Sequence, residues 1–134
     1  MAKLEYIEGI GDVYAAKLRG VGVKSINDLL KKGSTPKGRQ DLADNSDISR
    51  KLILTWINHA DLQRIKGIGA QYSELLEAAG VDTVVELATR NPDNLYQKML
   101  ETNTEKRLVR RPPALSFVQS WVEQAKVLPR VIEY

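Results

Sequence analysis

The sequence predicts an all-α protein built from two tandem copies of one helical unit. Apolar residues recur at spacings of three and four, which is the period of an amphipathic helix. No segment alternates between apolar and polar residues over the length of a strand. The first part of the chain also repeats in the second at an offset of 58 residues. With 134 residues, 43% of them hydrophobic, the chain is long enough and apolar enough to bury a hydrophobic core.

The repeat is carried by many positions in register. The segment Leu4–Gly11 (LEYIEGIG) aligns with Leu62–Gly69 (LQRIKGIG). After an insertion of seven residues in the second copy, the match resumes at a pair of tryptophans. We therefore expect a first unit over residues 1–61 and a second over 62–134, the second carrying the insertion and a C-terminal tail. Further matched pairs are Tyr14 and Tyr72, Leu29 and Leu87, and Trp56 and Trp121.

Each unit is expected to contain about five short helices. Capping side chains before proline predict helix starts at Thr35 and Asn91, and Ser46-Asp47 predicts a third start. One continuous helix from about Ser49 to Lys66 is expected to join the two units. Apolar spacing predicts helices around Val13–Leu18, Ile26–Leu30, Leu52–Ile57 and Val118–Ala125, and helix ends or turns are expected at Gly20, Gly22, Gly33 and Gly80.

Composition excludes several classes of function. The absence of cysteine excludes disulfides, thiolate nucleophiles and cysteine-ligated metals, and a single histidine, His59, argues against a histidine-rich metal site. No stretch approaches the roughly 20 apolar residues of a membrane helix, and the N-terminus lacks a secretory signal pattern. No nucleophile constellation or phosphate-binding glycine loop is present. We expect a soluble cytoplasmic protein without enzymatic activity, cofactor or membrane partner.

The charge of the chain is mildly basic and evenly spread. It has 20 Lys and Arg against 17 Asp and Glu, a formal net charge of +3. Residues 1–61 contain ten basic and eight acidic side chains, and residues 62–134 contain ten and nine. A nucleic-acid partner would therefore have to be held by a local arrangement of charges rather than by bulk charge.

Two glycine motifs are the sequence features that bear most directly on function. Ile7–Gly11 and Ile65–Gly69 share the pattern apolar-x-Gly-apolar-Gly, and a helix and a Gly-Val pair follow each. This pattern resembles the helix-hairpin-helix motif. The whole chain is similar to an uncharacterised tandem helix-hairpin-helix family, classed as a domain of unknown function, and to double helix-hairpin-helix, SAM-like DNA-binding domains. The resemblance implies sequence-independent contact with a nucleic-acid backbone through hairpin N–H groups, and it allows a monovalent cation at the hairpin carbonyl groups.

The two hairpins differ in their expected chemistry. In the second copy, Gly69 and Ala70 have no side chain that can cap the following helix, and Lys66 and Arg64 lie beside them. In the first copy, Asp12 can accept the same N–H groups, and Glu8 repels phosphate. We therefore expect the first hairpin to be structural and the second to contact phosphate.

Two basic segments complete the candidate set. Lys106–Arg111 has four basic residues in six and lies in or beside the insertion. It is expected either to hold a phosphate backbone or to form a solvated loop with Leu108 and Val109 turned inward. A looser cluster consists of Lys31, Lys32, Lys37 and Arg39.

These observations predict a non-catalytic, sequence-independent nucleic-acid-binding module, with the DNA phosphate backbone as the expected partner. The alternative is a protein–protein interaction scaffold or adaptor, which the near-neutral charge and the acidic first hairpin favour. The residues expected to contact nucleic acid are Arg64, Lys66, Gly67, Gly69, Ala70, Arg107, Arg110 and Arg111.

Overall fold

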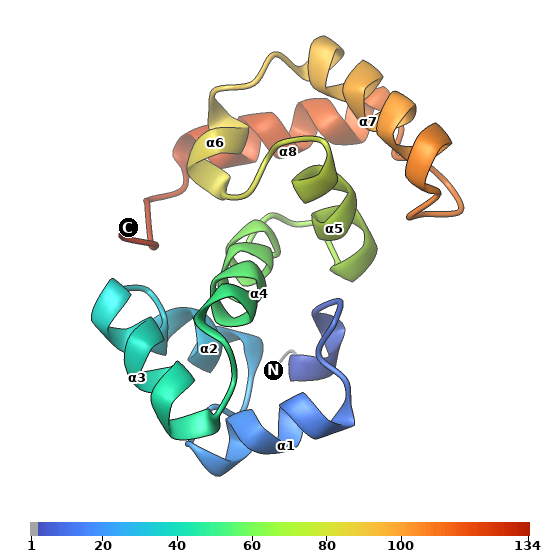
Figure 1. Ribbon diagram of the computed structural model, residues 1–134. Helices are drawn as coiled ribbons and strands as arrows, with labels where there is room; N and C mark the ends of the chain where they lie inside the picture. Colours follow the sequence, from blue (N-terminus) through green and yellow to red (C-terminus); the bar gives the residue numbers. More distant parts are fainter. Residues whose placement is uncertain (1–2) are drawn as a thin grey trace. The chain divides into compact units, whose positions relative to one another are not determined.

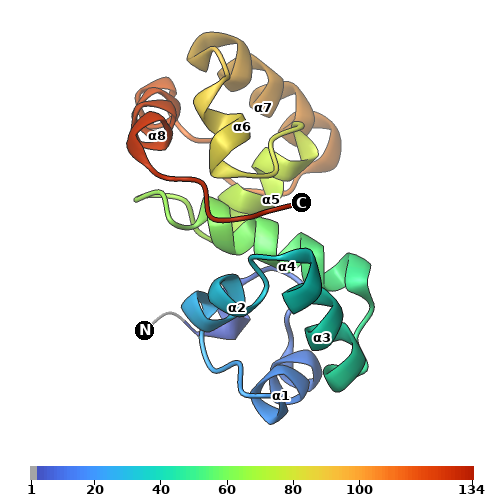
Figure 2. The ribbon, with the colours of Figure 1, turned by 90° about the vertical axis from the view of Figure 1, so that its left-hand side faces the viewer.

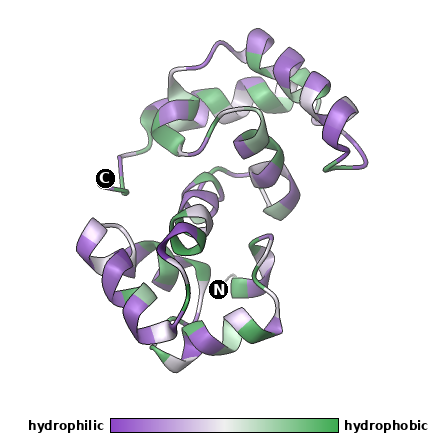
Figure 3. Cartoon of the chain, viewed as in Figure 1, coloured by the Kyte–Doolittle hydropathy of each residue, from purple (hydrophilic) through white to green (hydrophobic). Residues whose placement is uncertain are grey.

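The computed structural model describes residues 3–134, and every regular element within them is helical (Figure 1). The predicted all-α class is confirmed. The chain forms two compact units, one comprising the chain through Asp61 together with Val131–Tyr134, and the other comprising Leu62–Arg130. Each unit has a hydrophobic core of its own. The helices present a hydrophobic side and a hydrophilic side, as amphipathic packing around a core requires (Figure 3).

In the first unit, helix α3 packs against both α1 and α2. The largest fully buried side chain of this unit is Trp56 of α4, which is 1% exposed. The elements of the unit are the short 3-10 helix η1 (Leu4–Tyr6), α1 (Asp12–Gly20), α2 (Ile26–Lys32), α3 (Pro36–Ser46) and α4 (Arg50–Leu62), the last of which crosses the unit boundary by one residue.

In the second unit, helix α8 packs against α6 and α7, and α5 packs against α7 (Figure 2). Trp121 of α8 is 2% exposed and occupies the core, as its position in the repeat predicts. The elements are α5 (Ala70–Ala78), α6 (Val84–Ala88), α7 (Pro92–Lys106) and α8 (Leu115–Val127).

The duplicated sequence produces duplicated local geometry. Helices α1 and α5 have nine residues each, and α4 and α8 have thirteen each. The ring centroids of Tyr14 and Trp56 lie 5.1 Å apart, and those of Tyr72 and Trp121 lie 5.3 Å apart. Buried at matched positions are Ile10 and Ile68, Leu18 and Leu76, and Leu29 and Leu87.

Two of the three predicted helix starts are confirmed. Thr35 and Asn91 each accept a hydrogen bond of 3.0 Å from a backbone N–H three residues further on. The start predicted at Ser46-Asp47 is wrong, because Ser46 is the last residue of α3 and its hydroxyl donates to the carbonyl of Leu42. The side chain that accepts at the start of α4 is Ser49, whose hydroxyl is 3.2 Å from the Leu52 nitrogen.

The predicted joining helix is too long at its C-terminal end. Helix α4 ends at Leu62 rather than at Lys66. The Ile65 N–H donates to the Leu62 carbonyl at 3.1 Å, and the Ile68 N–H donates to Ile65 at 3.2 Å. These turns bring both isoleucines into the core. The second unit therefore begins with turns where the first has η1, and its described part contains four helices rather than the expected five.

The end of the C-terminal tail, Val131–Tyr134, which the repeat assigns to the second unit, groups with the first unit. Ile132 is 2% exposed and belongs to the hydrophobic core of the first unit. The backbone N–H of Glu133 donates to the Ser34 carbonyl at 2.7 Å. Burial of an apolar side chain together with a backbone hydrogen bond explains this placement.

Arg39 is part of the same arrangement and is not an exposed member of a basic cluster. Its side chain donates to the carbonyl of Gly33 at 2.8 Å and to that of Glu133 at 2.7 Å. The guanidinium carbon also lies 5.7 Å from the centre of the Tyr134 ring. Because burial disfavours the charged form, the pKa of Arg39 is lowered. The looser basic cluster predicted from the sequence therefore loses Arg39.

Candidate functional site

The second hairpin, which is the glycine segment Ile65–Gly69, presents the start of α5 with no side-chain cap among the described residues. Gly67 has φ +102°, a backbone conformation that favours glycine, and both Gly67 and Gly69 are exposed. Gly69 is the N-cap residue of α5 and Ala70 begins the helix, and no side chain accepts a hydrogen bond at the cap. The N–H groups of a helix's first turn carry a partial positive charge. This helix start therefore offers donors to an external acceptor.

Lys66 precedes the hairpin glycine and is held through its backbone. Its N–H donates to the side-chain oxygen of Gln124 at 2.9 Å, and the Gln124 amide donates back to the Lys66 carbonyl at 3.2 Å. The side chain is exposed, and its ammonium group forms no hydrogen bond or ion pair with the described residues. The backbone of Lys66 is thus fixed while its charge faces solvent.

Arg64 is placed differently from Lys66. It is half-buried, and its guanidinium donates to the carbonyl of Pro129 at 2.7 Å. This hydrogen bond ties the chain before the hairpin to the segment after α8. Through this contact Arg64 stabilises the position of the hairpin relative to the segment after α8.

The basic segment after α7 turns its apolar residues inward and its arginines outward. Asn103 exchanges two hydrogen bonds of 3.0 Å with the backbone of Val109, which is buried. Leu108 is half-buried, so both side chains have the inward orientation described for the solvated-loop alternative. The exposed cations of the segment are Lys106, Arg107, Arg110 and Arg111.

The structure brings this basic segment against the start of α5. The Tyr72 hydroxyl donates to the carbonyl of Arg111 at 3.2 Å. Gln71, the second residue of α5, lines a hollow of about 470 Å³ together with Arg107 and Arg110. Among the described residues, no Asp or Glu lines this hollow. Two features far apart in the sequence, the hairpin and the arginine segment, therefore form one basic surface.

The first hairpin lacks the side-chain cap that the sequence predicts. No side chain accepts a hydrogen bond at the N-cap residue of α1, Gly11, and Asp12 is exposed. The prediction that Asp12 satisfies these N–H groups is therefore wrong: Asp12 is the first residue of α1, and no side-chain cap hydrogen bond forms there among the described residues. Glu8, which is also exposed, occupies the position that Lys66 has in the second hairpin. The two hairpins differ in charge and not in capping.

Comparison with protein families gives a match for the chain. The sequence model of a domain of unknown function, DUF4332, matches residues 8–128. The chain belongs to the DUF4332 family. No curated protein and no solved structure matches it. The expected membership of an uncharacterised family is confirmed.

Two kinds of feature are absent from the described residues of this DUF4332 chain. No helix in residues 3–134 is both long and apolar enough to cross a membrane. The same part of the chain contains no group of three or more His, Cys, Asp or Glu side chains placed to hold a metal ion.

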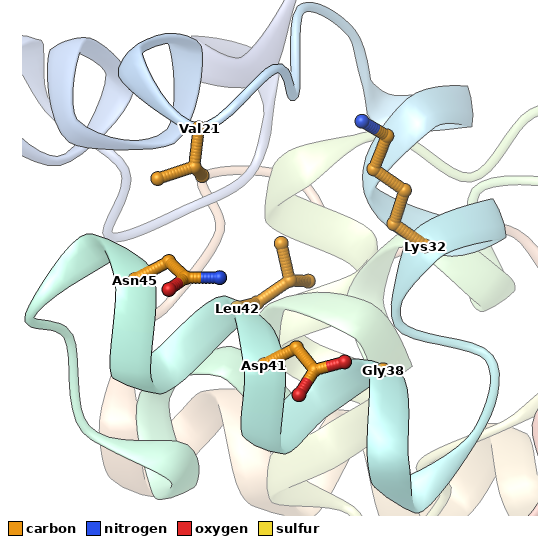
Figure 4. Close-up of a pocket in the computed structure, with 6 residues that line it drawn as sticks. All are labelled: Val21, Lys32, Gly38, Asp41, Leu42 and Asn45. Atoms are coloured by element: carbon orange, nitrogen blue, oxygen red, sulfur yellow. The ribbon is translucent and has the colours of Figure 1, made fainter.

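A second hollow of the DUF4332 chain, of about 280 Å³, lies in the first unit. Val21 and Leu42 line it, with Asn45 on one side and Lys32 on the other (Figure 4). The Lys32 ammonium donates to the Gly22 carbonyl at 3.1 Å, a contact that Arg90 and Gly80 repeat in the second unit at 3.5 Å. The Lys32 ammonium therefore stabilises the turn at Gly22, and we assign this hollow no binding role.

Sequence reasoning missed three residues beside the second hairpin. Tyr72, Phe117 and Gln124 line a hollow with Lys66 and Gly67. Phe117 is apolar and lies four residues before the buried Trp121 on α8, and Tyr72 is half-buried on α5, so a core position is the simplest interpretation of both from the sequence. One signal was available: the repeat places Gln124 opposite His59 and Phe117 opposite Leu52, so these positions differ in chemistry between the two copies.

Proposed function

We propose that this DUF4332 chain is a non-catalytic nucleic-acid-binding module built from two helix-hairpin-helix units. In this proposal the second unit contacts the phosphate backbone without regard to sequence. The observation that carries the proposal is the single basic surface formed by the start of α5 and the segment after α7.

The chemistry of this surface suits a phosphate. The uncapped N-terminus of α5 supplies backbone donors and a partial positive charge, to which an anion is attracted. Lys66 adds an exposed charge just before the helix start, and the exposed Arg107 and Arg110 add more beside Gln71. Backbone donors and exposed cations that contact phosphates position a nucleic acid but do not distinguish its bases.

The first unit is not part of the proposed contact. Its hairpin has an uncapped helix start too, but Glu8 and Asp12 place two exposed negative charges there. Since like charges repel, this hairpin disfavours phosphate. Its role is to build the fold of its own unit.

Fluorescence anisotropy with labelled duplex and single-stranded DNA tests the proposal. Four cations, Lys66, Arg107, Arg110 and Arg111, predict about four released counterions on duplex DNA, and hence a loss of affinity of roughly 100-fold between about 50 and 200 mM salt. Absence of binding to both DNAs at the lower salt concentration contradicts the proposal. That outcome favours the alternative, a protein-interaction scaffold, which the acidic first hairpin supports.

A further inference from the structure

Beside the second hairpin lies a small hollow with aromatic walls. It measures about 270 Å³ and lies between the hairpin and α8. Phe117 is 55% exposed, whereas large apolar side chains of this chain are otherwise mostly buried. Tyr72 and Trp121, whose ring centroids are 5.3 Å apart, supply the other aromatic surface. The remaining lining residues are Lys66, Gly67, Ser120 and Gln124.

An indole N–H lies at this hollow without an acceptor among the described residues. Trp121 is 2% exposed, and its N–H donates to no acceptor among the described residues. A Cβ placed on Gly67 would lie 2.9 Å from this nitrogen, so the N–H lies directly against the hairpin glycine that lines the same hollow. The nitrogen is not one of the fully buried unpaired atoms of the described residues, so it keeps some exposure, and an acceptor on a ligand in the hollow could accept a hydrogen bond from it.

The polar rim of the hollow is rigid on one side and charged on the other. Gln124 bonds both to the Lys66 backbone and, at 3.2 Å, to the hydroxyl of Ser120. The Lys66 side chain, which carries the charge, is exposed at the mouth. Aromatic walls, an unpaired donor and a neighbouring cation together fit a planar ring that carries acceptor atoms and is attached to an anionic group.

We propose that this hollow binds one unpaired nucleobase of a single strand, while Lys66 contacts the adjoining phosphate. The inference rests on the proposed function and specifies the form of nucleic acid. The volume lies at or below the lower limit of pockets for drug-sized ligands, which favours one ring system over a whole cofactor. Every base has a face that stacks on an aromatic side chain and edge atoms that accept hydrogen bonds.

The corresponding place in the first unit has different chemistry. Leu52 stands where Phe117 does, and Glu8 stands where Lys66 does. Leu52 is half-buried and packs against the core of its unit. A base-binding role therefore belongs to the second unit alone.

Anisotropy titrations with two fluorescent strands of equal length test this inference. One strand is oligothymidine, and the other has the same phosphates with abasic sugars. We expect the parent protein to prefer oligothymidine, and Phe117→Ala to weaken oligothymidine binding roughly tenfold while leaving the abasic strand unaffected. Val127→Ala, which shortens another exposed apolar side chain of α8 outside the hollow, is the matched control and should change neither.

The outcomes separate this inference from the proposed function. Equal binding of both strands by the parent, or equal binding of oligothymidine by the parent and Phe117→Ala, overturns the base-binding hollow and leaves the phosphate surface in place. A loss with Val127→Ala as large as with Phe117→Ala also overturns it, since any apolar surface of α8 would then serve. Failure of the parent to bind either strand at low salt overturns both proposals.

Discussion

The indole nitrogen of Trp121 lies directly against the backbone of Gly67, and Trp56 stands in the same relation to Gly9. A Cβ on Gly67 would lie 2.9 Å from the Trp121 nitrogen, and one on Gly9 would lie 3.3 Å from that of Trp56. Both glycines have positive φ, +102° and +93°. Gly9 and Gly67 are therefore favoured for two reasons: the turn needs a positive φ, and the packed tryptophan leaves little room for a side chain.

Gly67→Ala should lower the free energy of unfolding by about 2–4 kcal/mol, because the new methyl group strains the backbone and collides with a packed indole ring. Gly69→Ala is the matched control: Gly69 has φ −106°, and a methyl group there would meet nothing within 4 Å, so its loss should stay below about 1 kcal/mol. Urea denaturation followed by circular dichroism measures both. Equal losses for the two variants would show that the tryptophan contact is unimportant.

Arg39→Met should destabilise the first unit by about 2–4 kcal/mol, since it keeps the aliphatic stem but leaves the carbonyls of Gly33 and Glu133 without their charged donor. The neighbouring Lys37→Met is the control, because the Lys37 side chain is 87% exposed and a surface change there should cost less than about 0.5 kcal/mol. Chemical denaturation and amide hydrogen exchange at Glu133 report the effect. An unchanged exchange rate at Glu133 in Arg39→Met would contradict the clamp on the tail.

Glu5 should titrate below its ordinary range. Arg19 donates to both carboxylate oxygens, at 2.8 and 3.2 Å, and these hydrogen bonds lower the pKa of Glu5. Because the folded-state pKa is the lower one, the contribution of this pair to stability is present above the pKa of the unfolded chain. It is lost as the pH falls through the folded-state pKa. NMR titration of the Glu5 carboxyl carbon measures the shift, and Arg19→Ala should raise the pKa toward its ordinary value; no change in that variant would exclude Arg19 as the cause.

Local chemistry explains which helix boundaries can be predicted from the sequence. The starts at Thr35 and Asn91 are predictable because a capping side chain and a following proline act over four residues. Ser46 misleads because Ser49, three residues later, is equally suited to the same role and is the residue that caps α4. The end of α4 at Leu62 escapes prediction because no glycine or proline marks it.

Long-range contacts explain what the sequence could not predict. Arg39 looks like a surface cation among lysines, but its guanidinium donates to Gly33 and to the docked tail and is buried. The hairpin residues of the candidate site can be predicted from the sequence, because aligning the two repeats shows Lys66 at the position where the first copy has Glu8. The proximity of Tyr72 to Arg111 depends on how α7 ends and where the chain runs afterwards, which no local pattern encodes.

The charge exchange between the two hairpins gives the most direct test of the proposed function. The measurement is the salt dependence of DNA affinity for Lys66→Glu and Glu8→Lys, with Lys98→Glu as a control that makes the same charge change on an exposed face of α7. None of these surface changes should alter stability by more than about 0.5 kcal/mol. Lys66→Glu should weaken binding and flatten the plot of log affinity against log salt by about one unit, since one counterion fewer is released. Glu8→Lys should bind as well as the parent or better, and Lys98→Glu should keep the parent's slope. Parent-like binding by Lys66→Glu together with loss of binding in Glu8→Lys would contradict the assignment of phosphate contact to the second hairpin.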